Sequence, residues 1–144
     1  MTKREAALQA LRTSLAAGMP GHSVQRHGGL PLEIPAGFAL VTVHDGSCEA
    51  AEALLSPLQY EIAWLAPVTI EADSGTIRDD AAELFAARLV ADPTLGGAVD
   101  WAEVGAPEAE VVAVPALETG GQQPPVFALS VPVRLHFVAP SPAG

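Results

Sequence analysis

The sequence predicts a single α+β domain over residues 1–144, in which a mostly antiparallel sheet packs against two main helices. Two segments repeat apolar residues with helical spacing, and two longer segments alternate apolar and polar residues as strands do. The predicted strands follow one another along the chain, which favours sequential pairing with the helices laid over one face. A doubly wound nucleotide fold is not expected, because no glycine fingerprint lies between a strand and a helix.

Composition narrows the class further. The chain has 144 residues, of which 49% are hydrophobic, enough for one sizeable core. No run of eighteen apolar residues is present, so we expect no membrane span. The N-terminal segment lacks the apolar stretch of a secretory signal. Cys48 is the only cysteine, which excludes an internal disulfide framework and favours a cytoplasmic origin.

Charge is distributed unevenly. Residues 1–32 carry four basic groups and one acidic group, a net charge of +3, whereas residues 33–144 carry three basic and sixteen acidic groups, a net charge of −13. A body this acidic should not bind phosphate backbones. It suits a basic partner, or a surface that nucleic acid passes without being retained. Ordinary solubility explains the same charge equally well.

The first predicted helix begins near Thr2 and ends at about Ala17. Thr2 and Glu5 match a capping box, and Gly18 follows the last turn. Its basic face is either solvated or in contact with an acidic neighbour. The stripe that should face the core consists of Leu8, Leu11 and Leu15, flanked by Ala7 and Ala10.

Residues 19–36 are rich in Gly and Pro and predict a connection with, at most, a short edge segment. Residues 37–44 predict a strand that ends at the Asp45-Gly46 turn signal. Residues 48–55 are interpreted as a helical turn or a loop. The clearest strand follows over residues 59–73, with period-two alternation, and Pro67 within it indicates an edge, a bulge or a break.

The second helix is predicted over residues 76–92. Thr76 is the expected cap, with Asp79 three residues later. Two apolar rows, one of Ile77, Ala81 and Leu84 and one of Ala82, Phe85 and Leu89, should face the sheet, with the stems of Arg78, Glu83 and Arg88 reaching solvent from its edges. Asp92 precedes Pro93, which ends the helix. The following Gly96-Gly97 pair supplies conformations that other residues resist.

Two further strands are predicted near the C-terminus. Residues 110–114 form a short strand interrupted at Pro115, and residues 118–125 form a loop. Residues 126–138 form the last strand, with Pro132 again indicating an edge or a bulge. Residues 139–144 have the composition of a segment that is ordered only when a neighbour holds it. One face of the last strand carries Phe127, Leu129, Val131, Val133, Leu135 and Phe137.

Few residues are candidates for catalysis or metal binding. His44 and Asp45 invite a dyad interpretation, but Ser47 and Cys48 are too close along the chain for a triad, and no nucleophile elbow is present. His22 and His27 lie five residues apart without a third metal ligand nearby. We therefore assign no catalytic, cofactor-binding or metal-binding residue, and we expect no cofactor and no enzymatic activity.

Several phrases carry a family resemblance that spans nearly the whole chain. They are REAALQAL, LPLEIPAGFALVTVHDGS, LSPLQYEIAWLAPVTIEA, DPTLGGAVDW and VFALSVPVRLHF. In these phrases and in the order of its elements the chain resembles the phage tail-terminator (tail-completion) proteins, including their relatives in gene transfer agents. Phrases such as LSPLQYE and TLGG carry the most specificity.

The resemblance implies a small α+β subunit that assembles into a homo-hexameric ring. Such a ring caps the tail tube, stops its polymerisation and joins the tail to a head–tail connector or stopper protein. The implied partners are other copies of the chain, the tail tube protein and that connector. DNA would pass through the lumen without specific binding, and no membrane is involved. The implied location is the virion at the head–tail joint, reached from the host cytoplasm during assembly.

Two alternatives remain at this point. The chain could be another head–tail joining or tail tube assembly protein, because the same composition fits that role. It could also be a small enzyme that uses His44 and Asp45, or His136, although no complete catalytic set supports this alternative.

Overall fold

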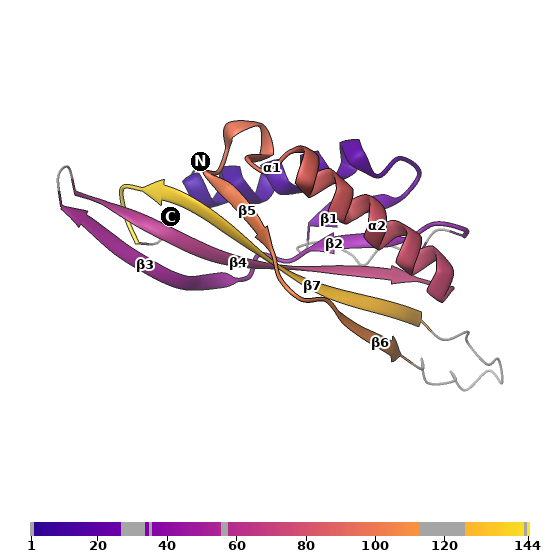
Figure 1. Ribbon diagram of the computed structural model, residues 1–144. Helices are drawn as coiled ribbons and strands as arrows, with labels where there is room; N and C mark the ends of the chain where they lie inside the picture. Colours follow the sequence, from indigo (N-terminus) through magenta and orange to yellow (C-terminus); the bar gives the residue numbers. More distant parts are fainter. Residues whose placement is uncertain (1, 27–33, 35, 56–57, 113–125, 143) are drawn as a thin grey trace.

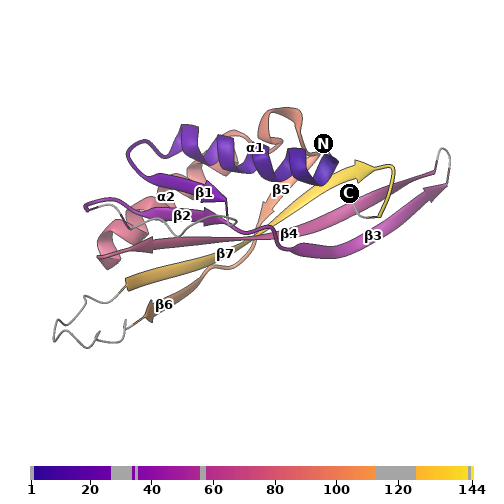
Figure 2. The same cartoon turned by 180° about the vertical axis from the view of Figure 1, so that it is seen from behind.

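The computed structural model describes residues 2–26, 34, 36–55, 58–112, 126–142 and 144. It is an α+β fold in which two helices, α1 (Lys3–Gly18) and α2 (Gly75–Ala91), cover one face of a mixed seven-stranded sheet (Figure 1). The opposite face carries no helix in the described part of the chain (Figure 2). The strands are β1 (Ser23–Arg26), β2 (Leu40–Val43), β3 (Ser47–Leu55), β4 (Leu58–Ala72), β5 (Trp101–Val104), β6 (Glu108–Val112) and β7 (Val126–Ala139).

Strands β4 and β7 are the axis of the sheet. They pair antiparallel from Tyr60 opposite Ala139 to Ala72 opposite Phe127. The other edge of β4 pairs with β3 over its first half and with β2 over its second half, and β1 extends β2 as the one parallel pair. The other edge of β7 pairs with β6 and then with β5. The predicted strand over residues 59–73 and the predicted strand over residues 126–138 are therefore confirmed.

Pro67 and Pro132 do not lie in edge strands, so the edge alternative is wrong, whereas the break that was the other alternative at Pro67 is present in the flanking ladder. They lie directly opposite each other in the two central strands. The Pro67 carbonyl accepts a hydrogen bond from the His44 N–H at 2.9 Å, and the Pro132 carbonyl accepts one from the Gly105 N–H at 2.8 Å. At Pro67 the partner of β4 changes from β3 to β2, and at Pro132 the partner of β7 changes from β6 to β5. A missing proline N–H is tolerated there because each flanking ladder already breaks at that point.

The core lies between the sheet and the two helices. Alternate residues of β4, from Ile62 to Ala72, are buried, and so are alternate residues of β7 from Val131 to Ala139. The strand period of two therefore produces one apolar face and one half-exposed face. From α1, Leu8, Leu11 and Leu15 pack on the apolar face as predicted, and from α2, Ala81, Phe85 and Leu89 do so. Leu84, assigned to a core-facing row, is 39% exposed instead.

The helix ends confirm one predicted cap and correct another. Thr2 caps α1 by accepting a hydrogen bond from the Glu5 N–H at 3.1 Å. In α2 the cap is Ser74, not Thr76, and its side chain accepts from the Ile77 N–H. Ser74 has extended backbone geometry, which suits a cap, whereas Thr76 is already within the helix.

Glycines act at two places where the chain needs them. Gly96 and Gly97 after α2 both have positive φ, 71° and 91°, as expected of the Gly-Gly pair. Gly18 is the last residue of α1, and a Cβ there would lie 2.4 Å from Cδ of Arg88. Gly18 thus makes room for a side chain of α2. The sequence predicts only that this glycine ends the helix.

Three further segments differ from or extend the predictions. Residues 47–55 form β3, not a helical turn or a loop, and the pairing of β3 with β4 has a register shift between Cys48 and Ala50. The edge segment expected within residues 19–36 is β1, and β5 is a strand that was not predicted. The predicted loop at residues 118–125 and the predicted end of the strand at 113–114 lie outside the described residues.

The C-terminal end lies against the chain's own first helix. Gly144 is buried, and a Cβ added to it would lie 2.6 Å from Cβ of Arg4. That a neighbouring subunit also holds residues 139–144 stays a prediction. Across the described residues, no helix is long and apolar enough to cross a membrane.

Candidate functional site

The residues considered for catalysis are engaged in structural contacts. Nε2 of His44 lies 2.9 Å from Oγ1 of Thr69, and the Asp45 carboxylate accepts a hydrogen bond of 2.7 Å from Arg26. Cys48 is exposed, with its thiol 3.4 Å from the Ala50 carbonyl oxygen. The imidazole of His136 stacks on the indole of Trp101. The contacts of His44, Asp45 and His136 join different elements, whereas the Cys48 contact is local to β3.

Of the two histidines considered for metal binding, the structure describes only His22. Nδ1 of His22 accepts a hydrogen bond of 2.9 Å from the Ala39 N–H, and partial burial lowers the pKa of His22 below its ordinary value. His27 lies outside the described residues. Within the described ranges, no group of three or more His, Cys, Asp or Glu side chains could hold a metal ion.

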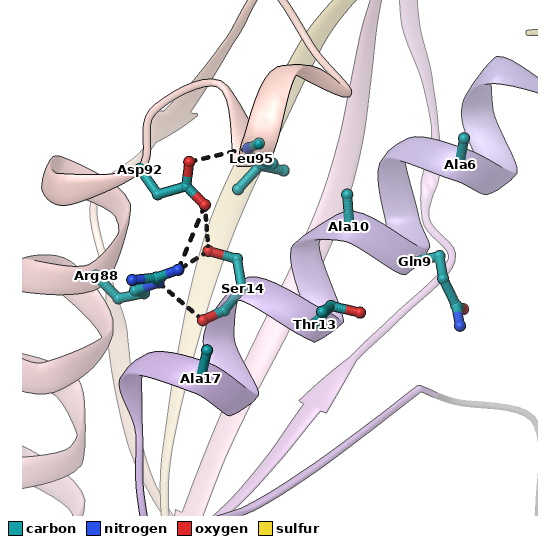
Figure 3. Close-up of a pocket in the computed structure, with 10 residues that line it drawn as sticks. Ala6, Gln9, Ala10, Thr13, Ser14, Ala17, Arg88, Asp92 and Leu95 are labelled. Atoms are coloured by element: carbon teal, nitrogen blue, oxygen red, sulfur yellow. Dashed lines mark hydrogen bonds and ion pairs between the residues drawn. The ribbon is translucent and has the colours of Figure 1, made fainter.

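Between α1 and α2 lies a shallow groove of about 410 Å³ (Figure 3). At one side, Ser14 Oγ donates to the Asp92 carboxylate at 2.8 Å, and Arg88 Nε donates to the Ser14 carbonyl at 2.9 Å. Two hydrogen bonds to the Asp92 carboxylate lower its pKa. The bond from the Gly96 N–H has the larger effect, and the bond from the Ser14 hydroxyl the smaller. Besides Ser14, the groove-lining residues of α1 are uncharged and, apart from Gln9, small, namely Ala6, Gln9, Ala10, Thr13 and Ala17.

The Arg88 side chain is 31% exposed, so it reaches solvent in part, as predicted, but it also makes a contact that the sequence did not predict. Its aliphatic stem crosses Gly18, and its guanidinium reaches the Ser14 carbonyl, because a helix end offers carbonyl groups that need donors. This polar contact fixes α2 against α1 and so fixes the width of the groove.

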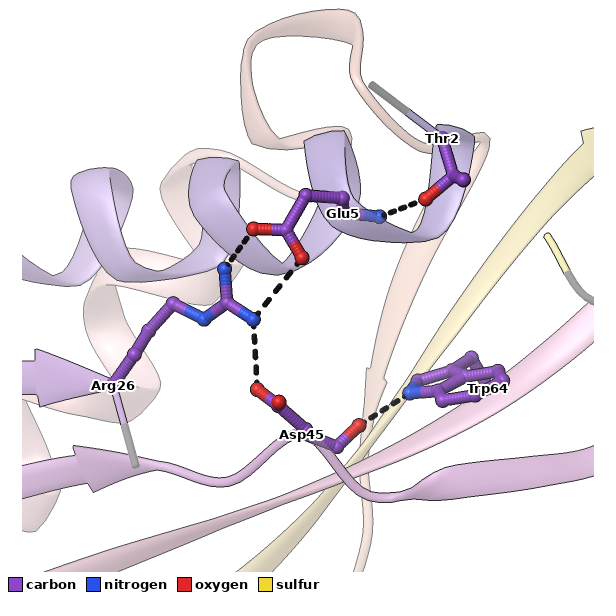
Figure 4. Close-up of polar contacts among 5 residues, drawn as sticks. All are labelled: Thr2, Glu5, Arg26, Asp45 and Trp64. Atoms are coloured by element: carbon purple, nitrogen blue, oxygen red, sulfur yellow. Dashed lines mark hydrogen bonds and ion pairs between the residues drawn. The ribbon is translucent and has the colours of Figure 1, made fainter. Parts of the chain in front are cut away.

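A second polar network holds the other end of α1 (Figure 4). Arg26 of β1 makes a bidentate ion pair with Glu5 of α1 and a second ion pair with Asp45. The hydrogen bond from Arg26 lowers the pKa of Glu5, and the two carboxylates raise the pKa of Arg26. Trp64 Nε1 donates to the Asp45 carbonyl at 2.6 Å. This network orients α1 along the sheet and leaves no free acid–base pair within it.

The helix-free face of the sheet is acidic. The pairing of β4 with its neighbouring strands shows that Glu61 and Glu71, and the residues paired with them, point to the side of the sheet opposite the core. Arg134 offsets part of this charge by donating to Glu49 at 2.6 Å, a contact that raises the pKa of Arg134. Nε2 of His136 lies 3.3 Å from Glu103. The glutamates on this face are Glu49, Glu52, Glu61, Glu71, Glu103, Glu108 and Glu110.

The pair formed by β3 and the first half of β4 extends past both helices at its tip (Figure 1), and we call these paired segments, residues 47–55 and 58–65, the arm. Every residue of β3 is exposed, and β3 pairs with β4 alone among the described strands. At the tip, Leu55 is 85% and Leu58 60% exposed. Reading residues 48–55 as a loop missed this arm. The signal that could have revealed it is the presence of apolar and acidic residues on both sides of the Ser56-Pro57 dipeptide, which is a turn signal in the sequence.

A second hollow, of about 350 Å³, lies between α2 and β5. Val90, Trp101 and Val104 line it, and all three are substantially exposed. The adjacent edge of β5 is partly covered, because the Ala102 N–H donates to the Pro93 carbonyl at 2.8 Å. Coverage of this kind protects a strand edge from pairing with another chain.

Comparison with known proteins does not identify a family: no protein-family model matches the chain, and no curated protein matches it significantly.

Proposed function

We propose that the chain is a structural virion protein of a phage tail or gene transfer agent, a tail-terminator-like subunit. Copies of the chain form a homo-hexameric ring that caps the tail tube, stops its polymerisation and joins the tail to the head connector or stopper protein. The protein is not an enzyme in this proposal. The resemblance of its phrases and element order to the tail-terminator family supports it.

The arm is the structural observation that carries the proposal. Its strand β3 is exposed along its whole length, and three leucines are exposed at its tip. A long uncovered strand edge with an apolar end is a liability for an isolated subunit. It becomes useful where subunits meet through different surfaces, as they do in a closed ring.

The acidic sheet face supports the same role. Seven glutamates on a face without helices repel phosphate groups. If this face lined the lumen of a ring, DNA would pass without being retained. Within the described ranges, the contacts of His44, Asp45 and His136 tie strands together and offer no nucleophile–base–orienter set.

The test is negative-stain electron microscopy of the purified protein mixed with tail tubes assembled from the tube protein of the same virion. Six-fold rings at one end of tubes of fixed length are the expected result. Binding along the whole tube, or only to head portals, would replace the terminator role with another tail or head–tail joining role. Turnover of a substrate that is lost on His44→Ala or His136→Ala without loss of fold would overturn the structural role.

A further inference from the structure

The hollow between α2 and β5 is an apolar surface with one carboxylate at its margin. Val90, Trp101 and Val104 line it and are substantially exposed. Among the described residues that line this hollow, Glu103 is the one charged group, and its side chain is 42% exposed. An exposed apolar patch with a polar margin is typical of a contact with another molecule. The carboxylate favours an occupant that brings a cation.

A phenylalanine is exposed at the opposite edge of the sheet. The strand order begins with β1 and ends with β5, so β1 and the hollow belong to different edges. Phe38 precedes β2, the neighbour of β1, and is 43% exposed. Its ring stands edge-on against the ring of His22, and a Cβ on Gly21 would lie 2.6 Å from it. The phenyl ring is therefore held in position although no described residue covers it.

The position of Arg12 follows from the way α1 lies beside β1. Residues 19–22 turn the chain, and Glu5 of α1 meets Arg26 of β1, so the two elements run antiparallel side by side (Figure 2). Arg12 follows Glu5 by two helical turns, which places it on the same side of α1, about 10 Å further along the axis. Ser23 precedes Arg26 by three residues, about 10 Å back along β1. Arg12 is therefore level with Ser23.

The same place is the neighbourhood of Phe38. Ser23 pairs with Leu40, two residues after Phe38, and Ser23 follows His22, whose ring contacts Phe38. Arg12 is exposed and forms no ion pair with the described residues. This edge of the molecule thus presents an aromatic side chain and an unpaired cation together.

We propose that Phe38 of one copy docks in the α2–β5 hollow of the next copy, with Arg12 beside Glu103 of that copy. The inference rests on the proposed function, because it names a contact that would build the ring of subunits. The two surfaces lie at opposite edges of one chain, so the contact is head-to-tail, which is the geometry that closes into rings. The arm takes no part in this contact.

The state of Glu103 is compatible with such a contact. Nε2 of His136 lies 3.3 Å from Oε2 of Glu103, which leaves Oε1 as an acceptor for the guanidinium of Arg12. A charge pair beside buried apolar side chains is less screened than one in open solvent. Phe38 would exclude water from the pair by packing against Val90 and Val104.

Charge selects Phe38 over the leucines of the arm as the occupant of the hollow. The charged residues of the arm are Glu49, Glu52 and Glu61, and the arm contains no Lys or Arg. Docking the arm would bring carboxylates toward Glu103, whereas docking Phe38 brings a cation.

The test is a charge exchange between the two edges. One variant carries Arg12→Glu and the other Glu103→Arg. Each alone should associate at least tenfold more weakly than the wild type, because like charges meet at every contact. An equal mixture should recover wild-type association, because the two variants can alternate around a ring and every contact then joins opposite charges. Sedimentation at rising concentration and the fraction of tail-tube ends that carry a ring are the two readouts.

Matched controls separate this contact from a general effect of charge. Lys3→Glu makes the same change at another exposed position of α1, and Glu110→Arg does so on β6; both should associate like the wild type. Phe38→Ala should weaken association, because it removes the side chain that fills the hollow. Thermal melts establish that every variant folds. Failure of the mixture to recover overturns the contact, as does an equal loss for Lys3→Glu and Arg12→Glu.

The contact and the terminator role can fail separately. If the wild type and both charge variants cap tubes equally, the contact is wrong and the terminator role stands. If the exchange pattern is seen in solution while tubes stay bare, the contact stands and the terminator role fails. A wild type that neither associates nor caps overturns both.

Discussion

The sheet beneath the helices and the β3–β4 arm share one long strand, β4, yet they differ in what covers them. Val68 and Ile70 in the second half of β4 are fully buried under the helices, whereas Leu58 at its start is 60% exposed. Both halves alternate apolar and polar residues. The difference teaches that alternation defines a strand and its two faces, whereas burial depends on whether another element lies over one of those faces.

The largest expected effect breaks the helix-covered region. Phe85→Ala removes a ring that is 1% exposed and should lower the free energy of unfolding by about 3–5 kcal/mol, because a cavity remains in the core. Leu55→Ala at the arm tip is the matched control and should change it by less than about 0.5 kcal/mol. Urea unfolding measures both. A comparable loss for the two variants would contradict the contrast between core and arm.

The contact between the helices should give the next largest effect. Ser14→Ala removes the hydroxyl that donates to Asp92 and accepts from Arg88, leaving both partners under-satisfied. We expect a loss of about 1–3 kcal/mol in the free energy of unfolding. Thr13→Ala, one residue away on the exposed side of α1, should have little effect. Equal melting temperatures for the two variants would show that the contact contributes nothing.

The capping of α2 offers a smaller change within the same helical layer. Ser74→Ala removes the side-chain acceptor for the Ile77 N–H and should cost about 1 kcal/mol. Thr76→Ala should cost much less, because Thr76 lies inside the helix and does not cap it. A larger loss at Thr76 than at Ser74, measured by chemical denaturation, would restore the cap predicted from the sequence.

A substitution in the arm should raise the free energy of unfolding, not lower it. Glu52→Gln removes the repulsion with Glu61 and should stabilise the fold by about 0.2–1 kcal/mol. Glu110→Gln on β6 faces Ala128 and should leave stability unchanged. A variant that is more stable yet assembles less well would indicate that the facing glutamates serve a contact between molecules. Destabilisation by Glu52→Gln would show that the pair does not repel.

The smallest expected effect depends on pH and concerns His22 beside β2. Its pKa is lowered by burial, and its Nδ1 accepts a backbone hydrogen bond only when that nitrogen is unprotonated. The stability that this hydrogen bond contributes should be fully present above the ordinary histidine pKa of about 6.5. It should be lost as the pH falls through the lower pKa that His22 has in the folded protein. Melting temperatures of wild type and His22→Asn across this window test the sign. A wild type that gains stability relative to His22→Asn on acidification would contradict it.

Much of the fold could be predicted from local patterns. The alternation in β7, the leucine stripe of α1 and the Thr2 cap each rest on residues close together in the chain. The position of Pro67 and Pro132 in the two central strands could not be predicted, because a proline inside a strand indicates an edge or an irregularity without showing which. Only the pairing of the two strands, with both flanking ladders changing at the same point, explains them.

The candidate surfaces were harder to predict than the fold. Residues 48–55 are hard to predict as a strand, because five of the nine residues of β3 are alanine or glutamate, which are depleted in strands. It is a strand because β4 supplies a partner edge, and pairing outweighs a weak local preference. The groove depends on Arg88 and Ser14, which lie 74 residues apart in the chain.

The sequence by itself determined the α+β class, the two helices, the central strands and the acidity of residues 33–144, because composition and periodicity are local properties. Tertiary structure alone decided which polar residues meet, which face of the sheet stays uncovered and which leucines remain exposed. The physical reason is that burial and charge pairing are properties of neighbours in space. Arg26 and Glu5, for example, are 21 residues apart in the chain and form an ion pair only because folding places β1 beside α1.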